Sequence, residues 1–539
     1  MNRPMNQSLP KRCRATCLGI LASTLLIHSP TFASVAIANV KAQYGSYVIL
    51  GQQSDGANVA IARTVIDSNF LCPTVSLVGQ TSSIPLTMTT RDNPNHFPVL
   101  VCETVVGFDQ QYQLNFADKR VPLAMAKSKI ERIAVFGDTG CKTAEVKKGK
   151  KQGCQPGSPA QPFKSLADSA AKTPPDVVLH MGDYNYRGTS GDIYFNQIES
   201  GQLVQKLQWP YDAGDGLTQP DHCGTKAPFY SQSAVNSNRP DIWANWHDDL
   251  FKPAKKLMAA APWIVARGNH ELCSRAGPGY FYFLDLNSNL LKGQQQISCP
   301  MPQLHQDALS NSVVIPSYKV SFDKLDVAVI DSTNACDSYN DSPFAAVYEQ
   351  VFKGLSTLVS NKNTWLVTHR PIWGVQSYDA TTSVACAAGD TQYSCVNQMM
   401  QQAIATQPSK NLPEAVKLVV TGHMHTFESV SFINSKRAPN IIVGSSGVEL
   451  AGKTTNTNDP IMVDGESAHI LTINTQVKKK GKTSDAFGFL DVTFDNVSGW
   501  TGNLVNPGKK LTIAKCSSAL NLAQGVCELA PGITVVPSS

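Results

Sequence analysis

The chain has 539 residues, of which 42% are hydrophobic and only 16% charged, with 37 Gly, 32 Pro and 14 Cys. This composition excludes an intrinsically disordered chain, which needs high net charge and few apolar residues, and a coiled coil, which so much glycine and proline would interrupt. At about 150 residues per domain, the length predicts two to four domains and permits a large core.

The first 36 residues are typical of an export signal peptide. Four basic residues precede a short apolar run at 17–27, and small residues suited to cleavage follow it. The run is shorter than the about 20 apolar residues of a membrane-spanning helix, so we expect cleavage, with a signal anchor as the alternative. No later stretch reaches that length, so we expect a secreted or periplasmic protein with no membrane anchor.

Removal of this leader lowers the formal net charge from +5 to +1, because the leader has four basic residues and no acidic one. Binding to nucleic acid or to a membrane surface calls for a concentrated basic face. We therefore expect neither. The lysine-rich segment at 147–151 is interpreted as a solvated loop, with steering of anionic substrates as the alternative.

Twelve cysteines remain after the leader, an even number that predicts disulfides in an exported chain. Neighbours along the chain suggest five pairs and leave Cys223 and Cys336, although spacing alone does not decide the connectivity. The suggested pairs are Cys72–Cys102, Cys141–Cys154, Cys273–Cys299, Cys386–Cys395 and Cys516–Cys527. Because no CxxC pair occurs, a structural zinc ribbon is not expected.

The chain divides into regions of different pattern. Residues 39–128 contain short β-prone stretches separated by turn residues, which suits a small N-terminal β-sandwich domain. From 130 to 515, apolar runs alternate with helical stretches, as in an α/β domain. Residues 516–539 would form a C-terminal tail with one disulfide. The stripe of Ile242, Trp243, Trp246 and Leu250, with Phe251 beside it, predicts a helix that covers the sheet.

Within the α/β region, five apolar strand patterns each end in residues that can bind a metal ion. The endings are GDTG at 137–140, GDYNY at 182–186, GNHE at 268–271, His369, and GHMH at 422–425. One aspartate after a strand carries little information, because turns and helix caps use it constantly. Ligands of α/β sheets collect outside the carboxyl ends of the strands, so we expect the five endings to converge.

The residue types in these endings are carboxylate, imidazole, amide oxygen and phenol. Carboxylates favour hard cations, imidazole suits Zn, Fe or Mn, and phenolate favours a hard trivalent ion. A carboxylate can bridge two metal ions, and paired metal ions promote phosphoester hydrolysis by activating water and neutralising charge. The residues therefore predict metal-assisted hydrolysis.

The same blocks resemble the calcineurin-like metallophosphoesterases, and specifically the purple acid phosphatases, whose pattern is GDxG, GDxxY, GNH[ED], VxxH and GHxH. Order and spread match over residues 132–425, with Leu366 in place of the valine of the fourth block. Gly140 stands where many relatives have a metal-binding histidine, and Tyr186 stands at the position of the iron-binding tyrosine. The resemblance implies a four-layer α/β/β/α sandwich, often preceded by a β-sandwich domain.

Carried over residue by residue, the resemblance implies a binuclear centre of Fe(III) and a divalent Fe, Zn or Mn ion. Asp138, Tyr186 and His425 would bind the ferric ion, Asp183 would bridge both ions, and Asn269, His369 and His423 would hold the divalent ion. His270 would bind phosphate and help to protonate the leaving alkoxide. Arg370 could contact the substrate phosphate, or form a structural salt bridge.

The implied function is that of an exported acid phosphatase, which hydrolyses small phosphate monoesters by direct attack of metal-bound hydroxide. A phosphodiesterase or nucleotidase with the same metal centre is one alternative, and a binding protein with a retired phosphatase fold is another. Three polar neighbours of the motifs are interpreted as supporting residues: Tyr184 and His180 as packing in the core, and Glu271 as a residue next to the ligands.

Overall fold

The computed structural model describes most of the chain from Ile37 onwards. The described residues are 37–80, 84–94, 97–142, 145–146, 150–151, 153–155, 157–187, 192–199, 202–210, 241–273, 275–300, 312–337, 344–359, 362–377, 386, 392–452, 460–495, 499–518 and 525–536. Only the backbone is described at 145–146, 150–151, 192–199 and 202–210. The expected signal peptide, Cys223 and residues 147–149 of the lysine-rich segment lie outside the described residues.

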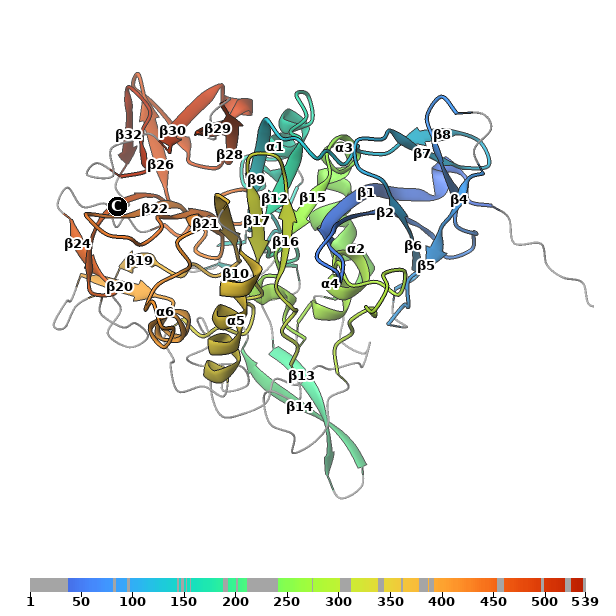
Figure 1. Cartoon of the computed structure of the whole chain (residues 1–539), viewed down its shortest axis with the longest axis horizontal. Coiled ribbons are helices and arrows are strands. Elements are labelled where there is room, and N and C mark those ends of the chain that lie inside the picture. The colour runs from blue at the N-terminus through green and yellow to red at the C-terminus, as the bar shows by residue number, and fades with distance from the viewer. Residues whose placement is uncertain are drawn as a thin grey trace, which may run out of the picture.

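A large mixed sheet runs through the molecule from its N-terminal to its C-terminal strands (Figure 1). Its strand order is β31 (Cys527–Leu529), β30 (Leu511–Ser517), β29 (Trp500–Asn506), β28 (Phe489–Phe494), β9 (Arg132–Phe136), β12 (Val177–His180), β15 (Trp263–Val265), β1 (Gln43–Gln52), β2 (Asn58–Asp67), β6 (Val99–Val106) and β5 (Thr89–Thr90). In its centre, β9, β12, β15 and β1 pair in parallel.

A second sheet of eight strands faces the first. Its order is β16 (Tyr318–Ser321), β17 (Asp326–Val329), β18 (Thr364–Val367), β21 (Val416–Thr421), β23 (Asn440–Val443), β22 (Phe427–Phe432), β25 (Glu466–Ile473) and β24 (Ile461–Val463). Here β17, β18, β21 and β23 pair in parallel. The central strands are almost wholly apolar, as expected where helices or another sheet cover both faces.

Helices cover the outer face of each sheet. They are α1 (Phe163–Ala170), α2 (Trp243–Trp246), the π-helical turn η2 (His247–Phe251), α3 (Lys252–Ala260) and α4 (Gly277–Phe283) on the first sheet, and α5 (Ala345–Leu358) and α6 (Gln398–Ala405) on the second. Alternate residues of β9 show the layering. Ile133 and Val135 pack between the sheets with Val367, whereas Ala134 and Phe136 pack against the helices. The four-layer α/β/β/α sandwich is confirmed.

The predicted helix that covers the sheet is also confirmed. Trp246, Leu250 and Phe251 are fully buried in the core between the first sheet and its helices, and Trp243 packs against that core. Ile242 is the exception, since it lies at the start of α2 and remains 36% exposed.

The N-terminal strands belong to two sheets. One sheet consists of N-terminal strands alone, and the other is the large mixed sheet described above. The sheet of N-terminal strands alone has the order β4 (Leu86–Thr87), β3 (Thr74–Leu77), β7 (Tyr112–Asn115) and β8 (Arg120–Pro122), and it shares a core with β1, β2 and β6. The strand β1 belongs to the large mixed sheet, because Ile49 pairs in parallel with Trp263 of β15. Strands on both sides of the sequence-based boundary near residue 128 therefore belong to the same sheet. The sequence-based boundary at 516 lies inside β30 of that sheet.

A buried ion network strengthens this junction. Glu103 of β6 accepts from Arg63 at 2.9 Å and from Arg91 at 2.7 Å. The same two guanidinium groups donate to carbonyl oxygens at the end of α4, Arg63 to Phe283 and Arg91 to Phe281. A buried charge is tolerated only when it is paired and hydrogen-bonded, so these contacts tie the N-terminal strands to the α/β body.

The remaining elements are small. They are η1 (Val40–Ala42), η3 (Asn269–Glu271), η4 (Pro507–Lys509), and the paired strands β10 (Glu145–Val146) with β11 (Lys150–Lys151), β13 (Asp192–Glu199) with β14 (Gln202–Pro210), β19 (Gly374–Ser377) with β20 (Tyr393–Val396), and β26 (Gln476–Lys479) with β27 (Lys482–Asp485) and β32 (Ile533–Val536). In the part of the chain that the structure describes, no helix is both long and apolar enough to cross a membrane.

The five suggested disulfides are confirmed. Each has its two Cα atoms 4.0–5.7 Å apart. Cys336, which the sequence left unassigned, is disulfide-bonded as well. The bond between Cys141 and Cys154 closes the loop that follows the first metal motif, and the bond between Cys273 and Cys299 lies just after the third.

Candidate metal centre

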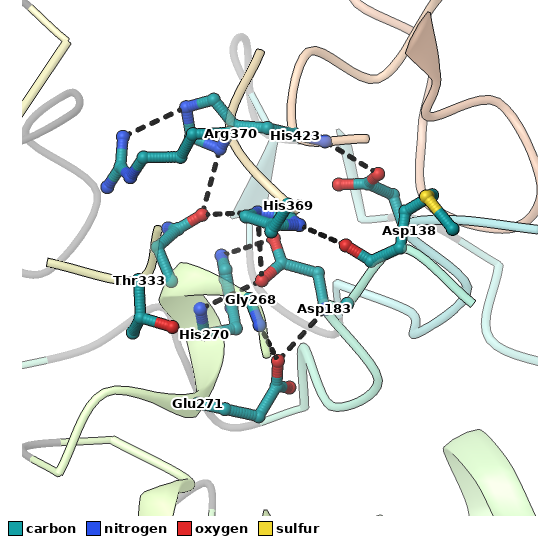
Figure 2. Close-up of polar contacts among 12 residues, drawn as sticks. Asp138, Asp183, Gly268, His270, Glu271, Thr333, His369, Arg370 and His423 are labelled. Atoms are coloured by element: carbon teal, nitrogen blue, oxygen red, sulfur yellow. Dashed lines mark hydrogen bonds and ion pairs between the residues drawn. The ribbon is translucent and has the colours of Figure 1, made fainter. Parts of the chain in front are cut away.

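The predicted ligands meet where strands of the two facing sheets end. From the first sheet, β9 leads to Asp138, β12 to Asp183 and β15 to Asn269. From the second sheet, β18 leads to His369 and β21 to His423. Figure 2 shows Asp138, Asp183, His369 and His423 close to one another. The sequence-based expectation of convergence at the carboxyl ends of the strands therefore matches the arrangement.

The first group of ligands surrounds the phenol of Tyr186. Its oxygen lies 2.6 Å from Asp183 Oδ2, 2.9 Å from Asp138 Oδ1 and 3.0 Å from His425 Nε2. One phenol proton can satisfy only one of these partners at a time. Burial, and next the charge of Asp138, raise the pKa of Tyr186 well above its ordinary value. A hard cation is the group that would satisfy all of these oxygens together.

The second group surrounds the amide oxygen of Asn269. His369 Nε2 lies 2.9 Å from it and His423 Nδ1 lies 2.8 Å from it. Asp183 Oδ1 lies 3.4 Å from His369 Nε2. All four side chains are more than nine-tenths buried.

Hydrogen bonds on the far side of each ring assign the tautomers in this second group. His369 Nδ1 lies 2.7 Å from the carbonyl oxygen of Met181, so Nδ1 carries the proton and Nε2 keeps its lone pair. His423 Nε2 lies 2.9 Å from Asp337 Oδ2 and 3.1 Å from Arg370 Nη1; a proton on Nε2 toward the nearer carboxylate leaves the lone pair on Nδ1. Two nitrogen lone pairs thus point at the same amide oxygen with no proton between them. Such an arrangement fits a bound cation.

Asp183 belongs to both groups. The ligand atoms of Asp138, Asp183 and His425 lie within 4.8 Å of one another, and so do those of Asp183, His369 and His423. One carboxylate oxygen faces Tyr186 and the other faces His369. The donor sets therefore fit a binuclear metal centre that shares Asp183, oxygen-rich on one side and nitrogen-rich on the other.

The backbone at this centre is held in an uncommon conformation. Asp138, Asp183, His423 and His425 have φ values of 55°, 58°, 75° and 50°. Few non-glycine residues adopt this left-handed region, and it costs of the order of 1 kcal/mol or more per residue. Such residues cluster at functional sites, where the surrounding structure overrides the local preference.

Gly140 and Tyr186 fit together as a pair. A Cβ atom at Gly140 would lie 2.7 Å from Cδ2 of Tyr186 and 2.8 Å from its backbone nitrogen. A larger residue at 140 would therefore displace the tyrosine. The glycine at 140 and the tyrosine at 186 are the two sequence details that resemble the purple acid phosphatases. The two residues pack directly against each other.

A family model described as calcineurin-like phosphoesterase matches residues 131–427, which is more than half of the chain. That span contains every residue of the two ligand groups. The chain belongs to the calcineurin-like phosphoesterase family.

Individual proteins are similar to parts of this phosphoesterase. Purple acid phosphatase 21 of Arabidopsis thaliana is 24% identical over 208 residues, a match that spans 38% of each chain. A purple acid phosphatase from seeds of yellow lupin (Lupinus luteus) is 13% identical, with a TM-score of 0.49 over 88% of this chain and 73% of that one. The structure of PhoD is 13% identical, with a TM-score of 0.49 over 94% of both chains.

His270 and Arg370 lie next to the candidate metal ligands. The His270 ring packs against Tyr186 with ring centroids 3.9 Å apart and the planes tilted by 39°, and its Nε2 lies 4.0 Å from Asp183 Oδ2. Arg370 is fully buried and forms an ion pair with Asp337 at 2.6 Å. The structural salt bridge that the sequence left open for Arg370 is therefore present, and a contact with substrate remains a prediction.

The three supporting residues lie where the sequence predicted. Glu271 accepts the backbone N–H groups of Asp183 and Tyr184, both at 2.9 Å, and so holds the second motif against the third. Burial, and then the charge of Asp183, raise the pKa of Glu271 to about 8. Tyr184 donates to the carbonyl oxygen of Ala266 at 2.9 Å, and His180 stacks on Tyr184 inside the core.

Asp337 is a neighbour of the candidate ligands that the sequence did not single out. Its Oδ2 lies between His423 Nε2 and the Arg370 guanidinium, and its Oδ1 accepts from Asn397 at 2.9 Å. Burial alone would raise the pKa of Asp337, but Arg370 and His423 hold it well below its usual range. A carboxylate on the outer nitrogen of a ligating histidine fixes the ring and makes it a better ligand. Asp337 lies in the loop after β17 but not directly at the end of that strand, and none of the five metal-binding patterns contains it.

Asp249 is the other missed residue. Its Oδ2 accepts the backbone N–H groups of Cys141 and Tyr186, both at 3.1 Å, and its Oδ1 pairs with Arg187. Burial raises the pKa of Asp249 to about 6. It lies in η2, and π-helical turns are frequent at functional sites. The sequence did contain a signal for Asp249, because this acidic residue lies three positions after Trp246, on the apolar face of the predicted helix.

Proposed function

We propose that this protein is an exported acid phosphatase with a binuclear metal centre, which hydrolyses phosphate monoesters. The observation that carries the proposal is the contact of the Tyr186 phenol with Asp183, Asp138 and His425. A phenol beside two carboxylates favours a hard trivalent ion, whereas the imidazole and amide ligands of the other group favour a divalent one. This asymmetry is the one expected of a purple acid phosphatase.

In this proposal Asp138, Tyr186 and His425 would hold Fe(III), Asn269, His369 and His423 would hold a divalent Fe, Zn or Mn ion, and Asp183 would serve both sets. The metal ions would supply Lewis acidity toward water and the phosphoryl group when bound. The chain provides the positioning. Asp337 and the Met181 carbonyl orient the two imidazoles of the nitrogen-rich group, and Glu271 fixes the loop that presents Asp183.

His270 is the residue proposed to act on the substrate. His270 as a residue is 7% exposed, more than the fully buried Asp138 and His369. Its ring rests on Tyr186, and its backbone N–H donates to Asp183 Oδ1 at 2.9 Å. This contact holds the imidazole at the margin of the centre, where it can bind a phosphate oxygen and give a proton to the leaving alkoxide.

Export is proposed from two features. The first 36 residues are typical of a signal peptide, and ten cysteines pair in the five disulfides given above. Disulfides persist in oxidising compartments and are rare in the cytosol. N-terminal sequencing of protein recovered from the periplasm or the medium tests this part, and a full-length chain retained in the cytosol would contradict it.

The activity is tested with the mature protein on 4-nitrophenyl phosphate and on bis(4-nitrophenyl) phosphate, with metal analysis of the same sample. We expect two metal ions per chain, iron among them, and faster hydrolysis of the monoester. Faster hydrolysis of the diester would favour a phosphodiesterase on the same centre. Absence of both metal and turnover would reject the enzyme. An Asp183→Asn variant is the control for contaminating phosphatase, because it removes the shared carboxylate.

A further inference from the structure

A cavity of about 690 Å³ lies at the edge of the sheets opposite the metal centre. It is lined by residues at the amino ends of β18 and β21, Trp365 and Val416 among them, whereas His369 and His423 follow the carboxyl ends of the same strands. At about 3.3 Å per residue, the seven residues from Val416 to His423 separate the two sites by roughly 20 Å. The cavity is therefore no part of the metal centre.

One wall of the cavity is aromatic. The rings of Trp365 and Trp500 meet edge to face with centroids 5.4 Å apart, and Phe494 lies 5.6 Å from Trp365. Both tryptophans are more than nine-tenths buried, yet neither indole N–H has a hydrogen-bond partner among the described residues. Neither indole nitrogen is fully buried, because the fully buried side-chain atoms without a partner do not include them. The two N–H groups are therefore accessible and free to donate a hydrogen bond, and the space that their side chains line is the cavity.

The rim of the cavity is positively charged. Lys324, Lys417 and Lys436 line it, and none of them forms an ion pair with a described residue. Glu414 is the one carboxylate in the lining. Arg437 also lines the cavity but adds no free charge, because Asp464 at 2.8 Å and Glu466 at 3.3 Å neutralise it. Three uncompensated cations face one anion, so the cavity attracts negative charge.

We propose that this cavity is a binding site for an aromatic organic anion. The ring of the ligand would pack on the wall of Trp365, Trp500 and Phe494, and its anionic group would accept from the indole N–H groups and the lysines. The volume lies in the range of about 300–1,000 Å³ of small-molecule sites, which combine an apolar lining with a few convergent polar groups. Inorganic phosphate would leave the aromatic wall unused, and a neutral sugar would leave the lysines unused.

The test uses 2-naphthalenesulfonate as the aromatic anion, titrated into the full-length mature protein while tryptophan fluorescence is followed. Naphthalene-2-sulfonamide is the matched neutral probe. We expect saturable quenching by the sulfonate, at least about five-fold weaker binding of the sulfonamide, and no displacement by inorganic phosphate, which would occupy the metal centre. Equal affinity for the two probes, or displacement by phosphate, would overturn the proposal.

Substitutions then locate the site. We expect the double variant Lys417→Gln with Lys436→Gln to bind the sulfonate at least about five-fold more weakly, because two attractive charges are lost. The matched control is Lys478→Gln with Lys482→Gln, which removes two exposed lysines outside the cavity lining and should bind as the parent does. These lysines lie on the surface, so a thermal melt should show both double variants folded. Unchanged binding in the first variant, or an equal loss in both, would refute the site.

Discussion

The phenol oxygen of Tyr186 lies 2.6 Å from the carboxylate of Asp183, the residue that both ligand groups share. If Tyr186 binds Fe(III), its phenolate produces a charge-transfer band in the visible spectrum. We expect the Tyr186→Phe variant to lose this band, because the ring remains and the oxygen is removed. The visible spectrum and the iron content of the purified variant measure the effect.

Tyr184→Phe is the matched control for that experiment. Tyr184 is equally buried and only two residues away, but its hydroxyl donates to the carbonyl oxygen of Ala266. The band should therefore persist in Tyr184→Phe. A band that survives in Tyr186→Phe with iron still bound would show that the tyrosine ligand has been assigned wrongly.

Asp337 should control the nitrogen-rich half of the centre. In Asp337→Asn the charge that holds His423 Nε2 and Arg370 is removed, while the shape of the side chain is kept. Loss of such an outer carboxylate weakens metal affinity or activity by about 10- to 100-fold. We expect one of two metal ions to bind correspondingly more weakly in a titration of the metal-free protein, with the other ion retained.

The control for Asp337 is Asp491→Asn, which breaks a carboxylate–arginine pair with Arg132 on β28 and β9, away from the ligands. Its metal titration should match that of the parent protein. If Asp337→Asn weakens both metal ions equally, or neither, then Asp337 does not act by orienting His423.

Metal removal should destabilise the fold. Without a cation, the lone pairs of His369, His423 and Asn269 face one another, and Asp138 and Asp183 share the proton of one phenol. A ligand that binds only the folded state adds about 2.7 kcal/mol at one hundred times its Kd. We expect treatment with a chelator to lower Tm and readdition of iron with zinc to restore it. In Asp183→Asn the Tm should respond much less to added metal, and an equal response would place the stabilising metal elsewhere.

We expect the folded protein to lose stability as pH rises, because of the buried carboxyl group of Glu428. This fully buried carboxyl accepts from Val375 N at 2.8 Å and from Thr472 Oγ1 at 2.7 Å, and burial raises its pKa from 4.5 to about 7. Because the folded pKa lies above the unfolded one, the stabilisation is complete below pH 4.5 and is lost as pH rises through 7.

Glu428→Gln removes this titration. The amide oxygen still accepts from Val375 N, and the amide nitrogen donates to Thr472 Oγ1 in place of accepting from it. We expect the variant to be more stable than the parent by about 3 kcal/mol at pH 8 and nearly equal to it at pH 4, measured by urea unfolding at both values. Glu528→Gln, at an exposed position, should show the same small difference at both pH values. A Glu428→Gln variant with no pH-dependent advantage would mean that the buried carboxyl is not neutral in the fold.

Most of the centre could be predicted because each ligand belongs to a short local pattern. The block at 182–186 follows β12 directly, and the block at 422–425 follows β21. An apolar strand, a glycine turn and a polar residue are all set within a few positions of one another. The disulfide pairs were predicted for the same reason, since each joins cysteines that are neighbours along the chain.

The domain boundaries depend on contacts between distant residues. Ile49 pairs with Trp263, more than two hundred positions later, so the N-terminal strands extend the same sheet. A β-prone segment has the same sequence pattern whether it belongs to a small sandwich or extends a large sheet. Which of the two forms depends on the strand with which its edge strand makes backbone hydrogen bonds in the folded protein.

The sequence by itself determined the chemistry of the site: which carboxylate, imidazole, amide and phenol groups follow the strands. Only the tertiary structure decided which other side chains support them. Asp337 reaches His423, and Asp249 reaches the backbone of Tyr186, because two sheets and their helices pack at those positions. Lys417 and Trp500 likewise come together at the far cavity from different sheets. Periodicity and turn preference act over a few residues, whereas such meetings depend on how whole layers pack.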